Sequence, residues 1–292
     1  MTFTIAKNGA TAVCNTKGGE LTSFVHDGIE YVWQGDPKYW SGQAPCLFPV
    51  VCRAKEDRVI VDGASYPMPK HGIARKVEYT PTEVTPDSVT FTLTESAETL
   101  AAYPHPFKLE IIHKVTGEGF STTYRVTNTD TKEMLFCIGG HPGFNCPLRE
   151  GEKFEDYSIL FANAAGAVAH ITEQEGGYMD PALPALDVIK NNELPLRYSD
   201  YDNDAIVVED LPEKSLKLVH RATGRGIRFD FHSFDAIGFW TPIKADAPFI
   251  CLEPWNGLPG GLGETPEMSS KKYVKTLAPG ETFTTGYQVT VL

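Results

Sequence analysis

Hydrophobic and polar residues alternate with a period of two along much of the chain. Between residues 120 and 126, Phe120, Thr122, Tyr124 and Val126 fall on one side and the residues between them on the other. The same alternation recurs in residues 89–94, 107–115, 227–231 and 283–291. Because half-buried antiparallel strands produce this pattern, each of these stretches is predicted to be a strand.

Short turn motifs separate the predicted strands. They are Asp62-Gly63, Gly117-Glu118-Gly119, Asn128-Thr129-Asp130, Gly224-Arg225-Gly226 and Pro279-Gly280. No long helical stripe is found, although one or two short helical turns are expected around residues 181–200. No linker or internal repeat divides the chain. The sequence therefore predicts an all-β fold, a large antiparallel β-sandwich that forms a single domain over residues 1–292.

Residues 255–270 depart from the strand pattern. This stretch, WNGLPGGLGETPEMSS, is rich in Gly and Pro and directly follows an apolar strand end. We therefore expect a long loop there. Long irregular loops in compact domains often carry function.

Charge excludes several classes of partner. The chain of 292 residues has 38 acidic and 26 basic side chains, and its net charge is −12. Nucleic acid and anionic membrane surfaces both require a basic footprint, and the sequence has no run of Lys and Arg. The apolar runs are far shorter than the roughly 20 residues needed to span a bilayer. Because no signal peptide is recognised at the start, we expect a cytoplasmic protein.

The six cysteines form no CxxC pair and show no zinc-type spacing. Four of them lie in apolar or strand-like settings: APCLF, VVCRA, LFCIG and FICLE. Buried free thiols are the expected state, with a catalytic, disulfide or metal-binding cysteine as the alternatives. The chain also lacks GxSxG, P-loop, GxGxxG-after-strand and HExxH motifs.

Four polar spots interrupt the β pattern: Arg53, the block 70–75, His141 within 138–145, and Glu253 within 249–255. His141 ends a strand and enters a Gly/Pro turn, where the backbone can approach a ligand closely. Glu253 ends a very apolar strand, where the pKa of a carboxylate is easily shifted. Brought together, the two side chains would make an acid/base pair.

Each spot also has a structural interpretation. His141 could simply hold its turn, Glu253 could be a solvated strand end, and Arg53 could pair with a nearby carboxylate. A metal bound jointly by His71 and His141 is a further alternative, although no carboxylate-rich cluster lies near either residue in the sequence. His113 falls on the apolar face of its strand and is expected to be a core residue.

Five ordered blocks carry a resemblance to a known family. They are FPVVCR at 48–53, HGIAR at 71–75, IGGHPGFN at 138–145, CLEPW at 251–255 and LAPGETF at 277–283. Together they resemble the galactose mutarotase-like, or aldose 1-epimerase, family. The match is to its shorter, LacX-like bacterial branch, which is related to the hexose-6-phosphate 1-epimerases. The resemblance implies the same large β-sandwich, also called a supersandwich, with a sugar-binding cleft.

The resemblance also implies roles for individual residues. His141 becomes the general acid/base at the ring oxygen of a sugar, and Glu253 the base at the anomeric hydroxyl. His71 and Arg53 become substrate-orienting groups. Asp204 resembles the carboxylate that binds sugar hydroxyls, although Asp202 could fill this role instead.

Two further residues are substrate-binding candidates. Trp255 is placed to stack on the apolar face of a sugar, with Trp240 and Phe144 as alternatives. Arg75 could join Arg53 in a basic spot for a sugar 6-phosphate. An imidazolium near Glu253 and Asp204 is expected to have its charged form favoured, which would keep His141 an acid near neutral pH.

The predicted function is that of an isomerase, an aldose 1-epimerase that interconverts the α and β anomers of a hexose without a cofactor or metal. A hexose-6-phosphate 1-epimerase and a non-catalytic carbohydrate-binding protein are the alternatives. The expected partner is a monosaccharide, a hexose or a hexose 6-phosphate, and the protein is expected to be a monomer or weak homodimer.

Overall fold

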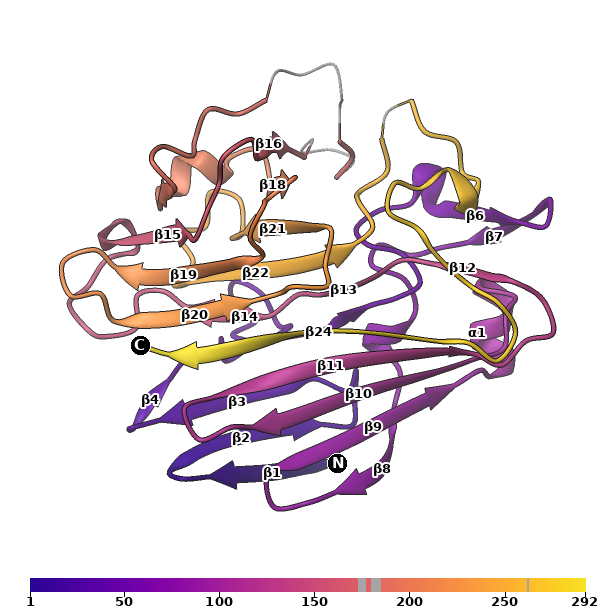
Figure 1. Ribbon diagram of the computed structural model, residues 1–292, viewed down its shortest axis with the longest axis horizontal. Coiled ribbons are helices and arrows are strands. Elements are labelled where there is room, and N and C mark those ends of the chain that lie inside the picture. The colour runs from indigo at the N-terminus through magenta and orange to yellow at the C-terminus, as the bar shows by residue number, and fades with distance from the viewer. Residues whose placement is uncertain (173–176, 180–184, 262) are drawn as a thin grey trace.

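Antiparallel β-sheets make up most of the molecule (Figure 1). The computed structural model describes residues 1–172, 177–179, 185–261 and 263–292. In this part of the chain, every pairing between named strands is antiparallel. The predicted fold class is thereby confirmed.

The largest sheet has nine strands and forms one layer. Its order is β17 (Glu193–Pro195), β15 (Tyr157–Phe161), β19 (Ser215–His220), β20 (Gly226–Asp230), β24 (Thr282–Val291), β11 (Gly119–Asn128), β10 (Phe107–Val115), β9 (Ser88–Thr94) and β8 (Thr80–Val84). The alternation predicted from sequence appears here directly, since Phe120, Thr122, Tyr124 and Val126 of β11 are buried and the residues between them are half-buried.

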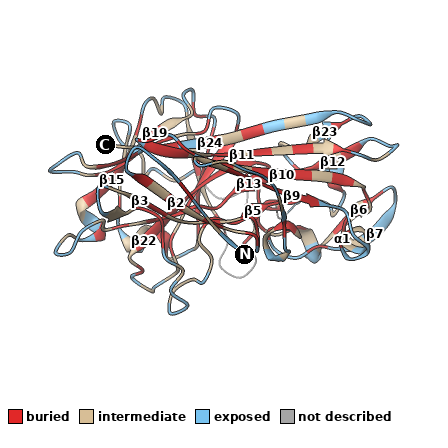
Figure 2. Cartoon of the chain, turned by 90° about the horizontal axis from the view of Figure 1, so that it is seen from below, coloured by how far each residue is buried: buried red, intermediate tan, exposed pale blue. Residues whose placement is uncertain are grey.

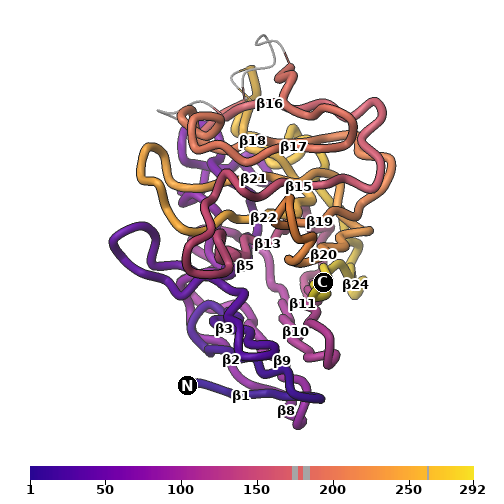
Figure 3. Tube along the Cα trace, turned by 90° about the vertical axis from the view of Figure 1, so that its left-hand side faces the viewer, coloured from indigo at the N-terminus to yellow at the C-terminus, as the bar shows by residue number. Residues whose placement is uncertain are grey.

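Two further sheets contribute to the facing layer. The first has the order β1 (Thr2–Lys7), β2 (Ala10–Asn15), β3 (Leu21–His26) and β4 (Ile29–Glu30). The second has seven strands, with the order β16 (Val168–Ile171), β18 (Ile206–Glu209), β21 (Ala236–Trp240), β22 (Phe249–Asn256), β13 (Ile138–Gly140) and β5 (Cys46–Leu47), while β14 (Gly143–Asn145) pairs with β22. Figure 3 shows the layers side on.

Small elements complete the described chain. The residues that the structure describes include two two-stranded sheets. One pairs β6 (Arg58–Val61) with β7 (Ala64–Pro67), and the other pairs β12 (Met134–Phe136) with β23 (Lys275–Leu277). The α-helix is α1 (Ala97–Ala102), and single 3-10 turns lie at η1 (Lys55–Asp57), η2 (Ala74–Lys76), η3 (Phe154–Asp156), η4 (Tyr198–Tyr201) and η5 (Met268–Ser270). No helix in the described residues is long and apolar enough to cross a membrane.

The core lies between the layers, where buried residues concentrate (Figure 2). Aromatic pairs connect the nine-stranded sheet to the seven-stranded one: Phe229 of β20 meets Phe144 of β14, and Phe161 of β15 meets Phe239 of β21. His113 is buried in this core and contacts Thr122 Oγ1 at 3.0 Å and the Gly19 carbonyl at 2.8 Å, as expected of a core histidine.

Several local predictions can be compared with the structure. Strand β22 continues through Trp255 and Asn256, so the predicted loop begins two residues too early, and Leu262 within it lies outside the described residues. A 3-10 turn at Tyr198–Tyr201 falls in the region where helical turns were expected, of which residues 181–184 lie outside the described chain. All six cysteines are buried and unpaired, as predicted.

Candidate active site

Strand β22 forms the floor of the candidate site. It pairs with β21 along one edge and with β13 and β14 along the other, and all eight of its residues are buried. Glu253 lies opposite Gly238 of β21 in this register. Because Glu253 belongs to this buried, mostly apolar strand, its carboxylate lies in the interior of the protein, and the residue is only 2% exposed.

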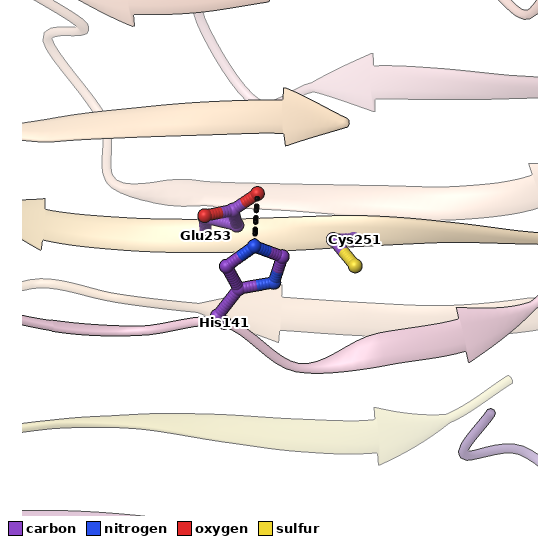
Figure 4. A group of neighbouring side chains, drawn as sticks. All are labelled: His141, Cys251 and Glu253. Atoms are coloured by element: carbon purple, nitrogen blue, oxygen red, sulfur yellow. Dashed lines mark ion pairs between the residues drawn. The ribbon is translucent and has the colours of Figure 1, made fainter. Parts of the chain in front are cut away.

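His141 lies in the turn between β13 and β14. The turn is fixed to β22 because the backbone N–H of Leu252 donates to the Pro142 carbonyl at 3.1 Å. Gly140 lets the chain pass close to the nine-stranded sheet, since a Cβ there would lie 2.8 Å from the Tyr124 hydroxyl oxygen. As a result, Nε2 of His141 lies 3.2 Å from Oε1 of Glu253 (Figure 4).

The pair opens onto a cavity of about 170 Å³. This volume is well below the roughly 300–1,000 Å³ of pockets that hold drug-sized ligands, so the cavity suits one small molecule. Six of the seven principal site candidates line it: His71, Arg75, His141, Asp204, Glu253 and Trp255. Trp240, named from the sequence as an alternative stacking residue, also lines it. The structure thus brings six of the seven candidates together around one hollow.

Arg53 is the candidate that does not line this cavity. Its guanidinium forms a two-point contact with the Asp57 carboxylate, with Nε 2.5 Å from Oδ1. The structure thus places Arg53 in the ion pair that the sequence left open as its alternative. Asp202 is likewise not among the described residues lining the cavity, whereas Asp204 is.

His71 is fixed by the backbone of the 48–53 block. Its main chain has a φ of +67°, and its ring Nδ1 accepts the backbone N–H of Cys52 at 3.2 Å. The neutral ring then carries its proton on Nε2. Gly72 is needed next to it, because a Cβ there would lie 2.1 Å from the Phe48 carbonyl oxygen.

Trp255 differs from the stacking residue that was predicted. Its side chain is fully buried and lies close to two glycines, since a Cβ at Gly238 would meet its ring at 2.5 Å and one at Gly139 at 2.7 Å. Its indole N–H makes no hydrogen bond of standard geometry among the described residues, but it lies close enough to the Glu253 carboxylate to lower the pKa of that carboxyl. Trp255 therefore offers the cavity an N–H group beside Glu253, with no exposed ring face.

Sequence reasoning missed Trp40, Lys70, Cys52 and Thr172 as lining residues. Lys70 directly precedes His71 in a block that was recognised, so its position was a usable signal. Trp40 lies in an irregular segment without a motif. Its ring stacks on the His141 imidazole with a centroid distance of 4.8 Å, and Trp240 meets that imidazole edge to face at 5.5 Å.

Burial governs the protonation of the pair. It lowers the pKa of His141 to about 3, with Lys70 and Arg75 acting in the same direction. It raises the pKa of Glu253 well above its usual value, which Lys70 opposes and Asp204 reinforces. The prediction that the charged imidazolium is favoured is therefore wrong, because removal from water outweighs attraction to the nearby carboxylates. In the ligand-free cavity, burial therefore favours the uncharged arrangement, with the shared proton on Glu253 and a neutral His141.

Comparison with known proteins identifies the class of protein that this fold and site define. The profile of the aldose 1-epimerase family matches residues 1–289, and the chain belongs to that family. It is 38% identical to the plasmid-encoded and chromosomal LacX proteins of Lactococcus lactis subsp. lactis, with both chains covered completely.

Solved structures show the same fold. A galactose mutarotase-like protein from Lactobacillus casei ATCC 334 is 29% identical, has a TM-score of 0.92 and covers 100% of both chains. A galactose mutarotase related enzyme from Lactobacillus acidophilus is 26% identical with a TM-score of 0.93, covering 100% of this chain and 97% of that one. The resemblance inferred from the five sequence blocks is thereby confirmed.

Proposed function

We propose that this protein is an aldose 1-epimerase that interconverts the α and β anomers of a hexose. One observation carries the proposal: a buried imidazole and a buried carboxylate lie 3.2 Å apart on the floor of a small cavity. This distance is within proton-transfer reach. Membership of the aldose 1-epimerase family supports the same reaction.

The chemistry requires two proton transfers. A cyclic aldose must lose the proton of its anomeric hydroxyl and gain one on its ring oxygen before the bond between C1 and the ring oxygen breaks. Ionised Glu253 takes the first proton and protonated His141 supplies the second. The open chain then rotates about its C1–C2 bond, and the ring closes with the roles reversed. Each positioned proton transfer accelerates a reaction by about 10²- to 10⁴-fold.

The pair holds one proton throughout this cycle. Ring opening starts with the proton on His141, and ring closure starts with it on Glu253, so the uncharged arrangement that burial favours is the one that closes the ring. Before opening, the proton passes from Glu253 to His141. The positive charge of Lys70 stabilises the carboxylate and also disfavours the imidazolium, whereas the face of Trp40 stabilises the imidazolium.

The remaining lining groups position the sugar. The Asp204 carboxylate accepts hydrogen bonds from sugar hydroxyls. His71 Nε2–H is a donor for sugar oxygens, and Trp255 Nε1–H is a donor directed at the Glu253 carboxylate, whose pKa it lowers. Because a hexose presents a hydroxyl on almost every carbon, a cavity with donors and acceptors on several sides suits it.

A hexose-6-phosphate 1-epimerase is the second candidate, and two basic residues favour it. Lys70 and Arg75 both line the cavity, and neither forms an ion pair with an acidic side chain in the described part of the chain. Unpaired cations beside a sugar site are suited to a phosphate group. Asp204 and Glu253 are the carboxyl groups that line the same cavity, and Glu20 lies close enough to Arg75 to raise the pKa of its guanidinium.

Polarimetry of a freshly dissolved pure anomer tests the proposal. Glucose, galactose and their 6-phosphates are compared at equal concentration, with the uncatalysed rate subtracted. We expect acceleration that disappears in Glu253→Gln and His141→Ala and persists in the exposed control Glu118→Gln. Saturable binding without acceleration would instead make the protein a carbohydrate-binding module. The absence of both binding and acceleration would contradict the enzyme and the binding module alike.

A further inference from the structure

Three different donor atoms converge at the acid/base pair. Cys251 and Glu253 are two residues apart on β22, so their side chains share one face of the strand. His141 reaches the same face from the turn between β13 and β14. One nitrogen, one sulfur and one oxygen from these three buried residues lie within 4.8 Å of one another (Figure 4).

The spacing of these atoms suits a small metal ion. Three atoms that are no more than 4.8 Å apart all lie within about 2.8 Å of one point, against about 2.0–2.2 Å for Zn–N and Zn–O bonds and 2.3 Å for Zn–S. Side-chain shifts of about 0.5–0.8 Å therefore complete the coordination. The donor set selects the ion, because Zn²⁺ accepts imidazole, thiolate and carboxylate together, whereas Mg²⁺ and Ca²⁺ prefer oxygen ligands alone.

The cavity supplies an entry path and an open position. His141 and Glu253 line it, whereas Cys251 is next to Glu253 on the same strand face but outside the lining, packed with Trp33, Phe249 and the neighbouring aromatic rings. An ion on the floor would thus have three protein ligands below it and a water or sugar oxygen above. We infer that this triad is an inhibitory zinc site, at which Zn²⁺ displaces the proton held by His141 and Glu253 and so blocks anomerisation.

The surroundings limit the affinity, so the site is a reversible one. Lys70 and Arg75 repel a cation in the cavity. The other ring nitrogen of His141, Nδ1, has no hydrogen-bond partner among the described residues, whereas ligating histidines usually donate this second N–H to an acceptor. The Cys251 thiol must also release its proton to solvent before it binds the ion.

Metal binding is tested directly by titration with Co²⁺, which replaces Zn²⁺ in such sites and gives a near-ultraviolet charge-transfer band when a thiolate coordinates it. We expect one equivalent of Co²⁺ to produce this band and Zn²⁺ to abolish it. Cys251→Ala removes the band. Cys52→Ala is the matched control, because Cys52 is the thiol that lines the cavity itself, and this variant retains the band.

Inhibition is the second readout, and it rests on the proposed function. Zn²⁺ should inhibit anomer interconversion reversibly, with release by a chelator, and Cys251→Ala should raise the half-inhibitory concentration at least about tenfold. Cys251→Val is a second variant should the alanine protein fail to fold. A band that persists without Cys251, or the absence of any band, overturns the zinc site. If the metal-free protein has no epimerase activity but still gives the band when Co²⁺ is added, only the proposed function is overturned.

Discussion

The Trp40 indole stacks on the His141 imidazole, with ring centroids 4.8 Å apart and planes inclined by 29°. Trp40 is in turn fixed by Trp33, because the indole N–H of Trp33 donates to the Trp40 backbone carbonyl at 2.8 Å. An aromatic face stabilises a neighbouring cation by about 0.5–2 kcal/mol. The stack therefore favours the imidazolium at the step where His141 must carry the proton, against the effect of burial.

Replacing Trp40 tests this role. We expect Trp40→Leu to lower kcat about 2- to 30-fold, which is the rate equivalent of losing the cation–π interaction. Trp40→Phe retains an aromatic face and most of kcat. Saturation kinetics separate this effect from sugar stacking, which would raise KM and leave kcat unchanged. An unaltered kcat in Trp40→Leu would show that Trp40 does not stabilise the His141 imidazolium.

The pH dependence of kcat/KM follows from the direction of the two pKa shifts. The free protein is active while the pair holds one proton. A second proton joins only as the pH falls towards the lowered pKa of His141, about 3, so the acid limb lies well below the 6.5 of an ordinary histidine. The alkaline limb lies above the ordinary glutamate value of 4.5, because burial raises the pKa of Glu253. We therefore predict a bell-shaped profile.

Polarimetry across the pH range, corrected for the spontaneous reaction, measures both limbs. Activity that halves between pH 7 and pH 6 would mean that His141 titrates like a solvent-exposed imidazole. The burial argument would then be incorrect.

Glu253 should make the protein less stable at neutral pH. Its folded pKa is raised above the ordinary 4.5 that it has in the unfolded chain. Well below pH 4.5 the carboxyl is protonated in both the folded and the unfolded chain, so its titration does not change the free energy of unfolding. As the pH rises through and above this value, ionisation stabilises only the unfolded chain. Glu253→Gln should therefore raise the free energy of unfolding at pH 8, with the gain vanishing near pH 4.

Thermal unfolding at both pH values measures this difference. The exposed Glu118→Gln serves as the control and should show no pH-dependent gain. Equal stability of Glu253→Gln and the unaltered protein at pH 8 would contradict the raised pKa.

The structure and the family resemblance assign different roles to Arg53 and Arg75, so variants of these two residues can distinguish them. Arg75 lines the cavity, whereas Arg53 is paired with Asp57 outside it. If the substrate carries a 6-phosphate, Arg75→Gln should lower kcat/KM for it about 10- to 100-fold, since charge-assisted hydrogen bonds to phosphate are strong. The value for the unphosphorylated sugar should change little.

Arg53→Gln is the matched variant. The structure predicts near-normal kinetics for it, and the resemblance predicts a loss. Kinetics with both sugars decide between them. Unchanged phosphosugar turnover in Arg75→Gln would exclude a phosphate role for this residue.

The fold was predictable where strands bury one side only. Strands β9, β10, β11, β20 and β24 belong to such a layer, and their alternation was visible in the sequence. Strand β22 is buried on both faces and shows no alternation, so its end at Asn256 was missed. The helix α1 has only six residues, too few to display a helical period.

The site was predictable where a residue belongs to a sequence motif. His141 and Glu253 each stood out by composition, but their proximity depends on β13 and β14 both pairing with β22, which no local pattern encodes. Trp40 approaches His141 only through long-range packing. Arg53 was misplaced because a motif fixes the backbone position of a residue, while its side chain follows a local partner, Asp57.

The central claim is that His141 and Glu253 act as one unit that exchanges a single proton with the two oxygens of a sugar ring. Saturation-transfer NMR of an equilibrated sugar measures the exchange between its α and β anomers in the unaltered protein, His141→Gln, Glu253→Gln and the double variant. We predict that each single variant loses about 10²- to 10⁴-fold in rate and that the double variant is no slower than the slower single one. Losses that multiply in the double variant, or a single variant that keeps the full rate, would contradict the claim.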